Sequence, residues 1–215
     1  MDNISFLIFQ LAVLLASVVI HEVSHGLMAL RLGDETAKLA GRLTLNPIKH
    51  LDWLGSFFVP LTLMVVGSPF LLGWAKPVPY NPMFLHKDYR FGPLKVALAG
   101  PASNIIIALI ASIAVRAGEL FLDPVTLGLL GFIVFLNIFL AVFNLMPIPP
   151  LDGSKILTTF LPPHYANALE RIGLVGIILV FAFLFIFLGP IQTLSSTVFY
   201  ALVGPSGVSH FANLF

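Results

Sequence analysis

Residues 21–25 read HEVSH, in which two histidines lie four positions apart and a glutamate follows the first. On an α-helix, residues at i and i+4 share a face, so His21 and His25 can present ring nitrogens to one ion. Glu22 lies beside them and can act as a general base towards water activated by a metal. So short a pattern also arises by chance, but two histidines and a glutamate in an apolar helix are costly without a function. We therefore predict a zinc site with one ion per chain.

A catalytic zinc ion needs three protein ligands and one open position. The chain has no cysteine, and its other four histidines lie in no recognisable metal motif. The strongest candidate for the third ligand is Asp152, in the run FNLMPIPPLDG over residues 143–153. Because Asp-Gly after prolines is also a common turn, these residues alone leave a purely structural role for Asp152 open.

Three asparagines interrupt apolar stretches: Asn104, Asn137 and Asn144. Amides in such places often bond between membrane helices, and we favour that role for Asn137. Asn144 lies close to Asp152 in the chain, so we predict that it donates to a carbonyl under attack, where a well-placed donor stabilises the developing oxyanion. For Asn104 the two roles are evenly balanced.

The composition indicates that lipid is the solvent for much of the chain. Of 215 residues, 58% are hydrophobic and 10% are charged, and the mean hydropathy is +1.00. Soluble domains average about 25% charged residues. The formal net charge is +1, and no basic or aromatic–basic cluster points to nucleic acid.

Stretches of about 20 apolar residues can cross a bilayer as helices. Four stretches qualify, at residues 4–30, 94–118, 124–147 and 172–188. A fifth, 190–203, follows Gly189-Pro190, which should break or kink a helix. We predict an all-α polytopic membrane protein, a single domain over residues 1–215, with about four to six transmembrane helices.

The metal site constrains the remaining apolar stretch, residues 51–73. His25 and Asp152 must reach the same membrane face, and 94–118 with 124–147 form an out-and-back pair joined by the short loop 119–123. The chain must therefore be on the same side before and after 51–73, so we predict that this stretch enters and returns. Its prolines and glycine make a re-entrant path plausible, although a true crossing with a hidden turn elsewhere stays an alternative.

Basic residues indicate which face is cytoplasmic. The loops 31–50, 74–95 and 148–171 hold ten of the eleven Lys and Arg, and only Arg116 lies elsewhere. Since basic loops stay in the cytoplasm, we predict a multi-pass protein of the cell membrane whose active site faces the cytoplasmic side.

The segment WAKPVPY, residues 74–80, has prolines two positions apart, which confines it to the edge of a sheet. Val78 and Tyr80 would then donate from the other edge. We predict an edge strand near the metal that holds an unwound substrate by strand addition, with a proline-rich surface loop as the alternative.

These motifs, in this order, resemble the site-2 protease family of intramembrane zinc metalloproteases. HEVSH is followed by N-x-x-P-x-x-P-L-D-G at residues 144–153, and AGPASN (99–104) resembles the G-x-x-x-N helix of that family. GWAKPVPYNP (73–82) is similar to the preceding segment of compact prokaryotic members, which lack a PDZ insertion. The resemblance covers about residues 10–160. It implies that Asp152 is the third ligand and that Asn144, with Asn104 as a second candidate, polarises the scissile carbonyl.

The function we predict is zinc-dependent hydrolysis of peptide bonds in a transmembrane protein or peptide within the lipid bilayer. A metal transporter or metal-sensing membrane protein is the alternative, since it also needs intramembrane histidines and carboxylates. A zinc-binding protein without activity is disfavoured by Glu22, because a structural site needs no adjacent base. No feature of the sequence specifies an oligomeric state.

Overall fold

The structure is a computed structural model, and it describes residues 3–58, 61–62, 65, 75–170 and 174–214. In that part of the chain every regular element is helical and there is no strand, so the all-α prediction is confirmed. The helices in chain order are α1 (Asn3–Leu32), α2 (Thr36–Leu39), α4 (Gly92–Gly118), α5 (Pro124–Asn144), α6 (Asp152–Phe160), α7 (Pro163–Glu170) and α8 (Leu174–Ala212). Three short turns accompany them, η1 (Pro47–His50), η2 (Trp53–Phe58) and η3 (Pro82–Phe84).

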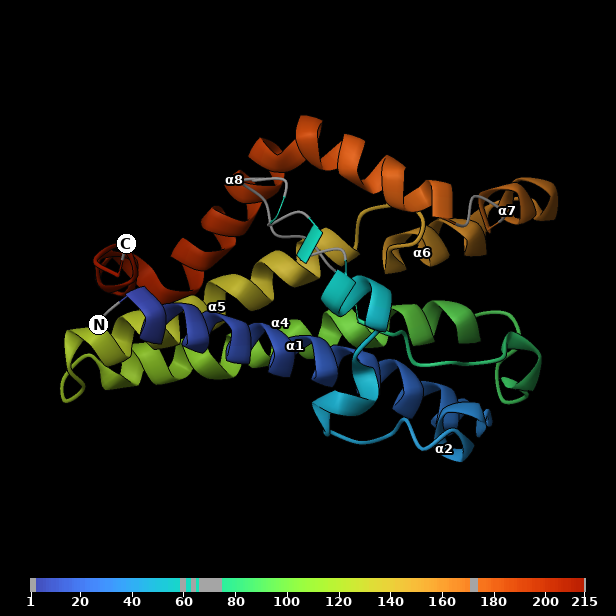
Figure 1. Cartoon of the computed structure of the whole chain (residues 1–215), viewed down its shortest axis with the longest axis horizontal. Helices are drawn as coiled ribbons and strands as arrows, with labels where there is room; N and C mark the ends of the chain where they lie inside the picture. The colour runs from blue at the N-terminus through green and yellow to red at the C-terminus, as the bar shows by residue number, and fades with distance from the viewer. Residues whose placement is uncertain (1–2, 59–60, 63–64, 66–74, 171–173, 215) are drawn as a thin grey trace.

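Four helices are long and apolar enough to cross a membrane. Their spans within the described residues are Ile4–Leu32, Gly92–Gly118, Pro124–Asn144 and Ile186–Ala212. Successive long helices run in opposite directions, which places the N-terminus, the 119–123 loop and the C-terminus at one end of the bundle (Figure 1). The protein is therefore a multi-pass membrane protein of four spanning helices within the described residues, the lower limit of the prediction.

The helices α4, α5 and α8 enclose the larger apolar core, and α1 packs mainly on α4. The buried side chains of that core are Ala108, Ala111, Val115, Val134, Ile138, Phe199 and Val203. Several are small, which lets membrane helices approach closely. Because α4 contacts α1, α5 and α8, it is the helix against which the histidine-bearing face of α1 packs.

The start of α5 is fixed by Asp123, whose carboxylate accepts from the backbone N–H groups of Val125 and Thr126. Such a side-chain cap satisfies donors that a helix start leaves free. The helix ends at Asn144, three residues before the predicted end at 147. The chain then turns back sharply, and that turn brings Asp152 towards α1.

The sequence predicts a break or a kink at Gly189-Pro190, and helix α8 bends along its length without a break at that pair (Figure 1). It runs as one helix through Pro190, and its backbone breaks at Gly204, with φ +74°. Proline is tolerated in membrane helices because neighbouring groups can satisfy the freed carbonyls. At the Gly204 break, the guanidinium of Arg116 donates to the carbonyls of Ala201 and Leu202.

The two ends of the stretch between η1 and residue 76 meet. The backbone N–H of Lys76 donates to the carbonyl of His50 at 2.9 Å, and Arg42 donates to the carbonyl of Lys76 at 2.6 Å. Much of the predicted re-entrant stretch, 51–73, lies outside the described residues. Its described ends nevertheless lie side by side, as the enter-and-return argument requires.

Residues 75–81 do not form the predicted edge strand. They have no ladder partner among the described residues and are held instead by side chains. The carboxylate of Asp34 accepts from the N–H of Asn81 at 2.6 Å, and Arg42 holds the Lys76 carbonyl at the other end. The segment is thus anchored at both ends beside the second half of α1.

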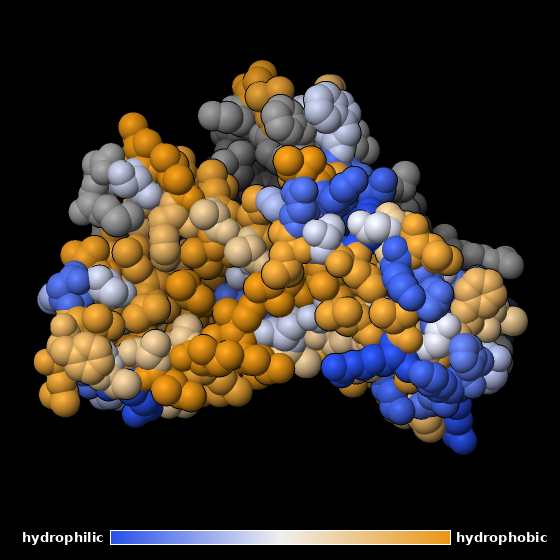
Figure 2. All heavy atoms as spheres, turned by 90° about the horizontal axis from the view of Figure 1, so that it is seen from below, coloured by the Kyte–Doolittle hydropathy of each residue, from blue (hydrophilic) through white to orange (hydrophobic). Residues whose placement is uncertain are grey.

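Hydrophilic side chains gather at the end of the molecule where α2 lies, and the remainder of the visible face is largely apolar (Figure 2). This end carries the loops that follow α1 and precede α4. Two tryptophans, Trp53 and Trp74, bracket residues 51–73, and tryptophan is enriched at membrane interfaces. Trp53 is 79% exposed, and Trp74 lies outside the described residues.

Candidate metal centre

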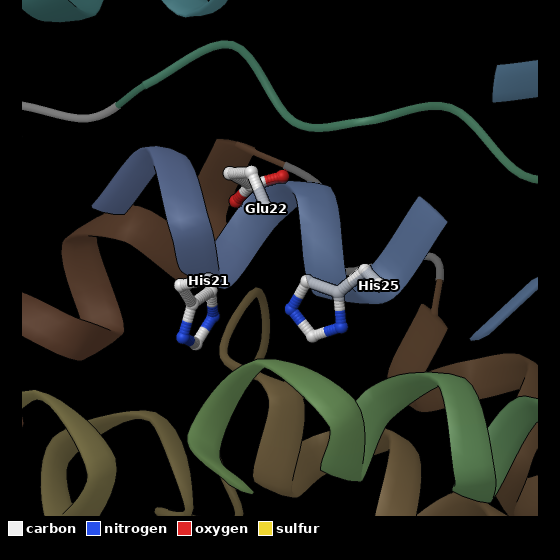
Figure 3. Close-up of side chains that lie close together, drawn as sticks. All are labelled: His21, Glu22 and His25. Carbon is white, nitrogen blue, oxygen red and sulfur yellow. The ribbon is translucent and has the colours of Figure 1, made fainter. Parts of the chain in front are cut away.

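His21 and His25 lie on one face of α1 and are both buried, with 6% and 9% of their surface exposed. Figure 3 shows their rings pointing towards α4, while Glu22 lies on the opposite side of the helix, towards residues 75–81. One potential ligand atom from each of these three residues lies within 4.8 Å of the others. The helical spacing of HEVSH therefore produces the arrangement expected from it.

Asp152 is brought to the histidines by a close backbone approach at Gly153. A Cβ on Gly153 would lie 2.1 Å from the carbonyl oxygen of Leu145 and 2.4 Å from that of Met146. Only glycine permits this contact, so the first turn of α6 lies directly on the end of α5. Both roles suggested for the Asp-Gly pair are therefore compatible: the pair forms a tight turn, and that turn places the Asp152 carboxylate beside the histidines.

The three predicted ligands converge on a common point. Oδ2 of Asp152 lies 3.0 Å from Nε2 of His21 and 3.3 Å from Nε2 of His25. A tetrahedral zinc ion with bonds of about 2.0–2.1 Å separates its ligand atoms by about 3.3 Å. The spacing of the oxygen from both nitrogens therefore suits tetrahedral zinc.

Hydrogen bonds fix the outer nitrogen of each ring. Nδ1 of His21 lies 2.6 Å from Oδ1 of Asn104, and Nδ1 of His25 lies 2.7 Å from the carbonyl of Val96. Both partners accept, so each Nδ1 carries a proton, and a neutral ring then keeps a lone pair on Nε2. Among the described residues, the buried Oδ2 of Asp152 has no polar neighbour that could donate other than the two Nε2 atoms. With both rings neutral, three converging lone-pair atoms repel one another unless a cation lies between them, so the donor set fits zinc.

Gly100 of α4 lies directly beneath this cluster. A Cβ there would lie 2.4 Å from Nε2 of His25 and 2.5 Å from Nε2 of His21. Ala102, the next residue but one, is exposed. Gly100 instead leaves room for the nitrogens that would bind the ion.

Gly100→Ala is expected to weaken zinc binding by at least about tenfold, because even changes outside the ligand shell cost 10–100-fold in metal affinity. The added methyl group would overlap Nε2 of both histidines, so both imidazoles would have to move. Zinc affinity of the purified protein can be measured by competition with a chromogenic chelator. Gly189→Ala is the matched control, since a Cβ at Gly189 meets nothing within 4 Å. Equal affinity for the two variants would contradict the assigned place of the metal.

The carboxylate of Glu22 is held by the 75–81 segment. Its Oε2 accepts from the backbone N–H of Val78 at 2.8 Å. Gly26, one turn further along α1, makes room for this contact, because a Cβ there would lie 2.8 Å from Cγ1 of Val78. The predicted donor Val78 N–H is thus directed at the side of α1 that carries the candidate base.

The predicted asparagines are placed differently from one another. Asn144 lies on the last turn of α5 and donates from Nδ2 to the carbonyl of Leu140; in the described part of the chain no hydrogen bond joins it to the His–Asp cluster. Asn104 is fully buried and occupied at both ends, by His21 and by Asn137. The described structure thus engages both ends of the Asn104 side chain between helices, and its predicted role at the substrate carbonyl stays a prediction.

Sequence reasoning missed three contributors to the site, namely the Val96 carbonyl, the opening at Gly100, and the bond from Asn104 to His21. A backbone carbonyl carries no signal in side-chain patterns. Asn104 does lie four residues after Gly100, one helical turn away on the same face. The sequence shows this spacing of Gly100 and Asn104, but it does not show that the helix packed against them carries His21 and His25.

Comparisons with known proteins agree with this geometry. The sequence model of Peptidase family M50 matches residues 122–188. The chain is 37% identical over 195 residues to a Bacillus subtilis protein named "Putative zinc metalloprotease YwhC", covering 87% of this chain and 84% of that protein. It is 32% identical over 204 residues to the Mycobacterium tuberculosis protein named "Putative zinc metalloprotease Rip2", covering 91% of this chain and 73% of that protein. No solved structure matches.

Proposed function

The chain belongs to peptidase family M50, the site-2 protease family, and on that premise we propose which of its residues perform the reaction and from which side of the membrane. It is an intramembrane zinc metalloendopeptidase, and the metal-transporter alternative is not favoured. The proposal treats residues 1–215 as one catalytic domain. The observation that carries it is the convergence of Asp152 Oδ2 with Nε2 of His21 and of His25 at 3.0 and 3.3 Å.

In this proposal His21, His25 and Asp152 hold the metal, and Glu22 is the general base. Zinc bound there supplies a Lewis acid that activates water for attack on a carbonyl. Glu22 accepts the proton of the attacking water and transfers it to the departing amine nitrogen as the C–N bond breaks. The water oxygen becomes part of the new carboxyl group. Glu22 lies on the side of α1 away from the two imidazole rings (Figure 3), which suits a proton carrier better than a ligand.

Asn144 is proposed to donate to the carbonyl oxygen of the scissile bond. One of its two Nδ2 hydrogens is used within α5, on the carbonyl of Leu140. The second has no partner in the described part of the chain, and the turn that carries Asp152 follows immediately. A donor at this position would stabilise the oxyanion as it develops.

The proposed substrate is a membrane-embedded segment that has unwound locally, since a transmembrane helix keeps its peptide groups in hydrogen bonds. Residues 75–81 pass over Glu22 and are secured at both ends (Figure 3). An extended substrate alongside this segment would place its peptide bond next to the base. We therefore keep the proposal that residues 75–81 hold the substrate. In this proposal the substrate itself is the strand with which the segment pairs.

The active site is proposed to open towards the cytoplasm of a cell-membrane protein. Support comes from the basic loops around α2 and before α4, which lie at the end of the bundle where α1 finishes (Figure 1); His21 and His25 are in the second half of that helix. The N-terminus and the 119–123 loop would then be external.

Single cysteines at Lys38, Lys87 and Leu120 test this orientation in the cysteine-free chain. Leu120 is 94% exposed and, unlike Asp123, does not cap a helix. With an impermeant thiol reagent on intact cells, only the cysteine at 120 should react, and those at 38 and 87 should react after lysis. Labelling of 38 and 87 from opposite sides would show that residues 51–73 cross the membrane. Labelling of 38 and 87 alone in intact cells would reverse the orientation.

A further inference from the structure

A chain of buried polar side chains crosses three helices and ends at His21. The Oγ of Ser17 in α1 accepts from Nδ2 of Asn137 in α5 at 3.0 Å. Nδ2 of Asn104 in α4 donates to Oδ1 of Asn137 at 2.9 Å, and Oδ1 of Asn104 accepts from Nδ1 of His21 at 2.6 Å. Both asparagines are fully buried, and Ser17 is 3% exposed. The chain closes on α1, one helical turn from where it starts.

The direction of every bond in this chain follows from one backbone carbonyl. Nδ2 of Asn137 also donates to the carbonyl of Ile133 at 2.9 Å, and a carbonyl can only accept. This fixes which end of Asn137 carries the N–H groups, so its oxygen must accept from Asn104. The oxygen of Asn104 must then accept from His21, because its nitrogen is already directed at Asn137.

We infer that Asn137 and Asn104 are positioning residues that set the tautomer of His21, so that α5 determines the state of a ligand on α1. This inference rests on the proposed role of His21 as a ligand. His25 reaches the same state directly, through the carbonyl of Val96. Both ligand rings are therefore fixed by backbone carbonyls, His25 by one bond and His21 through two amides.

The arrangement has a physical rationale. A neutral imidazole can carry its proton on either nitrogen, and only the form protonated at Nδ1 offers Nε2 to the metal. A buried amide chain of fixed polarity excludes the wrong form, because that form would leave the Asn104 oxygen facing a lone pair. Partners of this kind outside the ligand shell are worth 10–100-fold in metal affinity.

Two substitutions at Asn137 separate a directional role from packing. A carboxyl group at this position still accepts from Asn104, whether or not it is protonated, so Asn137→Asp keeps the polarity of the chain. Asn137→Leu fits an apolar core but lets Asn104 turn over. We expect zinc affinity within about threefold of wild type for Asn137→Asp and about tenfold weaker for Asn137→Leu, with Asn104→Leu weaker by about 10–100-fold. Simple packing predicts the reverse order at Asn137.

Ser112→Ala is the matched control, since Ser112 is a buried α4 hydroxyl bonded only within its own helix. It should leave zinc affinity unchanged. The measurement is chelator competition on the purified full chain in detergent. If Asn137→Leu binds zinc as tightly as wild type, the directional role is refuted.

The tautomer of His21 can also be measured directly, by NMR spectroscopy. In metal-free protein labelled with ¹⁵N-histidine, long-range ¹H–¹⁵N spectra distinguish a protonated Nδ1 from a protonated Nε2, and His21→Gln identifies the His21 signals. We expect the Nδ1-protonated form in wild type and a mixture in Asn137→Leu. An Nε2-protonated His21 in wild type would overturn the inference. Neither zinc affinity nor the tautomer measurement depends on proteolysis. A failure of the proposed proteolytic activity can therefore be distinguished from a failure of the positioning role of Asn137 and Asn104.

Discussion

Glu22→Gln is expected to bind zinc as wild type does and to lose cleavage by about 10³-fold, within the range of 10²–10⁴ attributed to a positioned acid–base group. The amide oxygen of glutamine can still accept from the N–H of Val78, so the local structure is kept. It cannot accept the proton of water at neutral pH. In this variant, elemental analysis should therefore find the zinc content of wild type, while cleavage of a single-span substrate should be lost.

The matched control for this substitution is Glu119→Gln, in the exposed loop at the far end of the bundle. It changes the same chemical group and should leave both zinc content and cleavage intact. Near wild-type cleavage by Glu22→Gln would remove the general base from the mechanism. Loss of zinc from Glu22→Gln would instead make Glu22 a ligand.

Asp152→Ala is expected to weaken zinc binding by more than about 100-fold, since it removes a direct ligand, whereas groups outside the ligand shell account for 10–100-fold. The two imidazoles keep their Nδ1 partners in this variant, but two ligands alone hold zinc poorly. Asp152→Asn should be intermediate, because an amide oxygen can still approach the ion without its charge. Cleavage should fall in parallel with zinc occupancy.

Asp88→Ala is the control for removal of a carboxylate at the same end of the molecule. Asp88 forms an ion pair with Lys95 at 2.7 Å and has no contact with the His–Asp cluster in the described structure. Zinc affinity should be unchanged in it. If Asp152→Ala retained full zinc occupancy, Asp152 would serve only the turn that the Asp-Gly pair forms.

The part of the site predicted from the sequence is the part that depends on one helix. The spacing of His21 and His25 fixes their common face wherever α1 lies, and Glu22 follows from the same geometry. The position of Asp152 depends instead on a backbone contact between Gly153 and Leu145. The Asp-Gly sequence is compatible with that contact, but only the folded structure shows that the contact places the Asp152 carboxylate beside the histidines.

The errors in the predicted fold have similar physical causes. WAKPVPY has the composition of an edge strand, but an isolated strand needs a partner, and Glu22 and Asp34 take the backbone N–H groups of Val78 and Asn81 instead. At Pro190 the sequence allows a break or a kink, and α8 continues through it as one helix. Local propensity is a weaker guide where lipid replaces water, because helical backbone bonding is then the cheapest way to satisfy peptide groups.

The parity argument draws on the whole chain and stays a prediction. It required residues before and after 51–73 to share one membrane face, and the backbone bond between His50 and Lys76 joins the two ends. Such a constraint needs no knowledge of the path between them. Asn104 shows the opposite case, since its role depends on His21, a residue 83 positions away.

The most direct test of the central claim uses the purified chain in liposomes with a single-span substrate. Metal is removed with a chelator, one equivalent of zinc is returned, and the reaction proceeds in H₂¹⁸O with a zinc indicator trapped in the lumen. We predict that cleavage stops without metal and resumes with zinc, and that mass spectrometry finds one ¹⁸O in the new carboxyl terminus. Zinc that binds without cleavage, or that enters the lumen instead, would contradict the assignment of this chain as a zinc-dependent intramembrane endopeptidase.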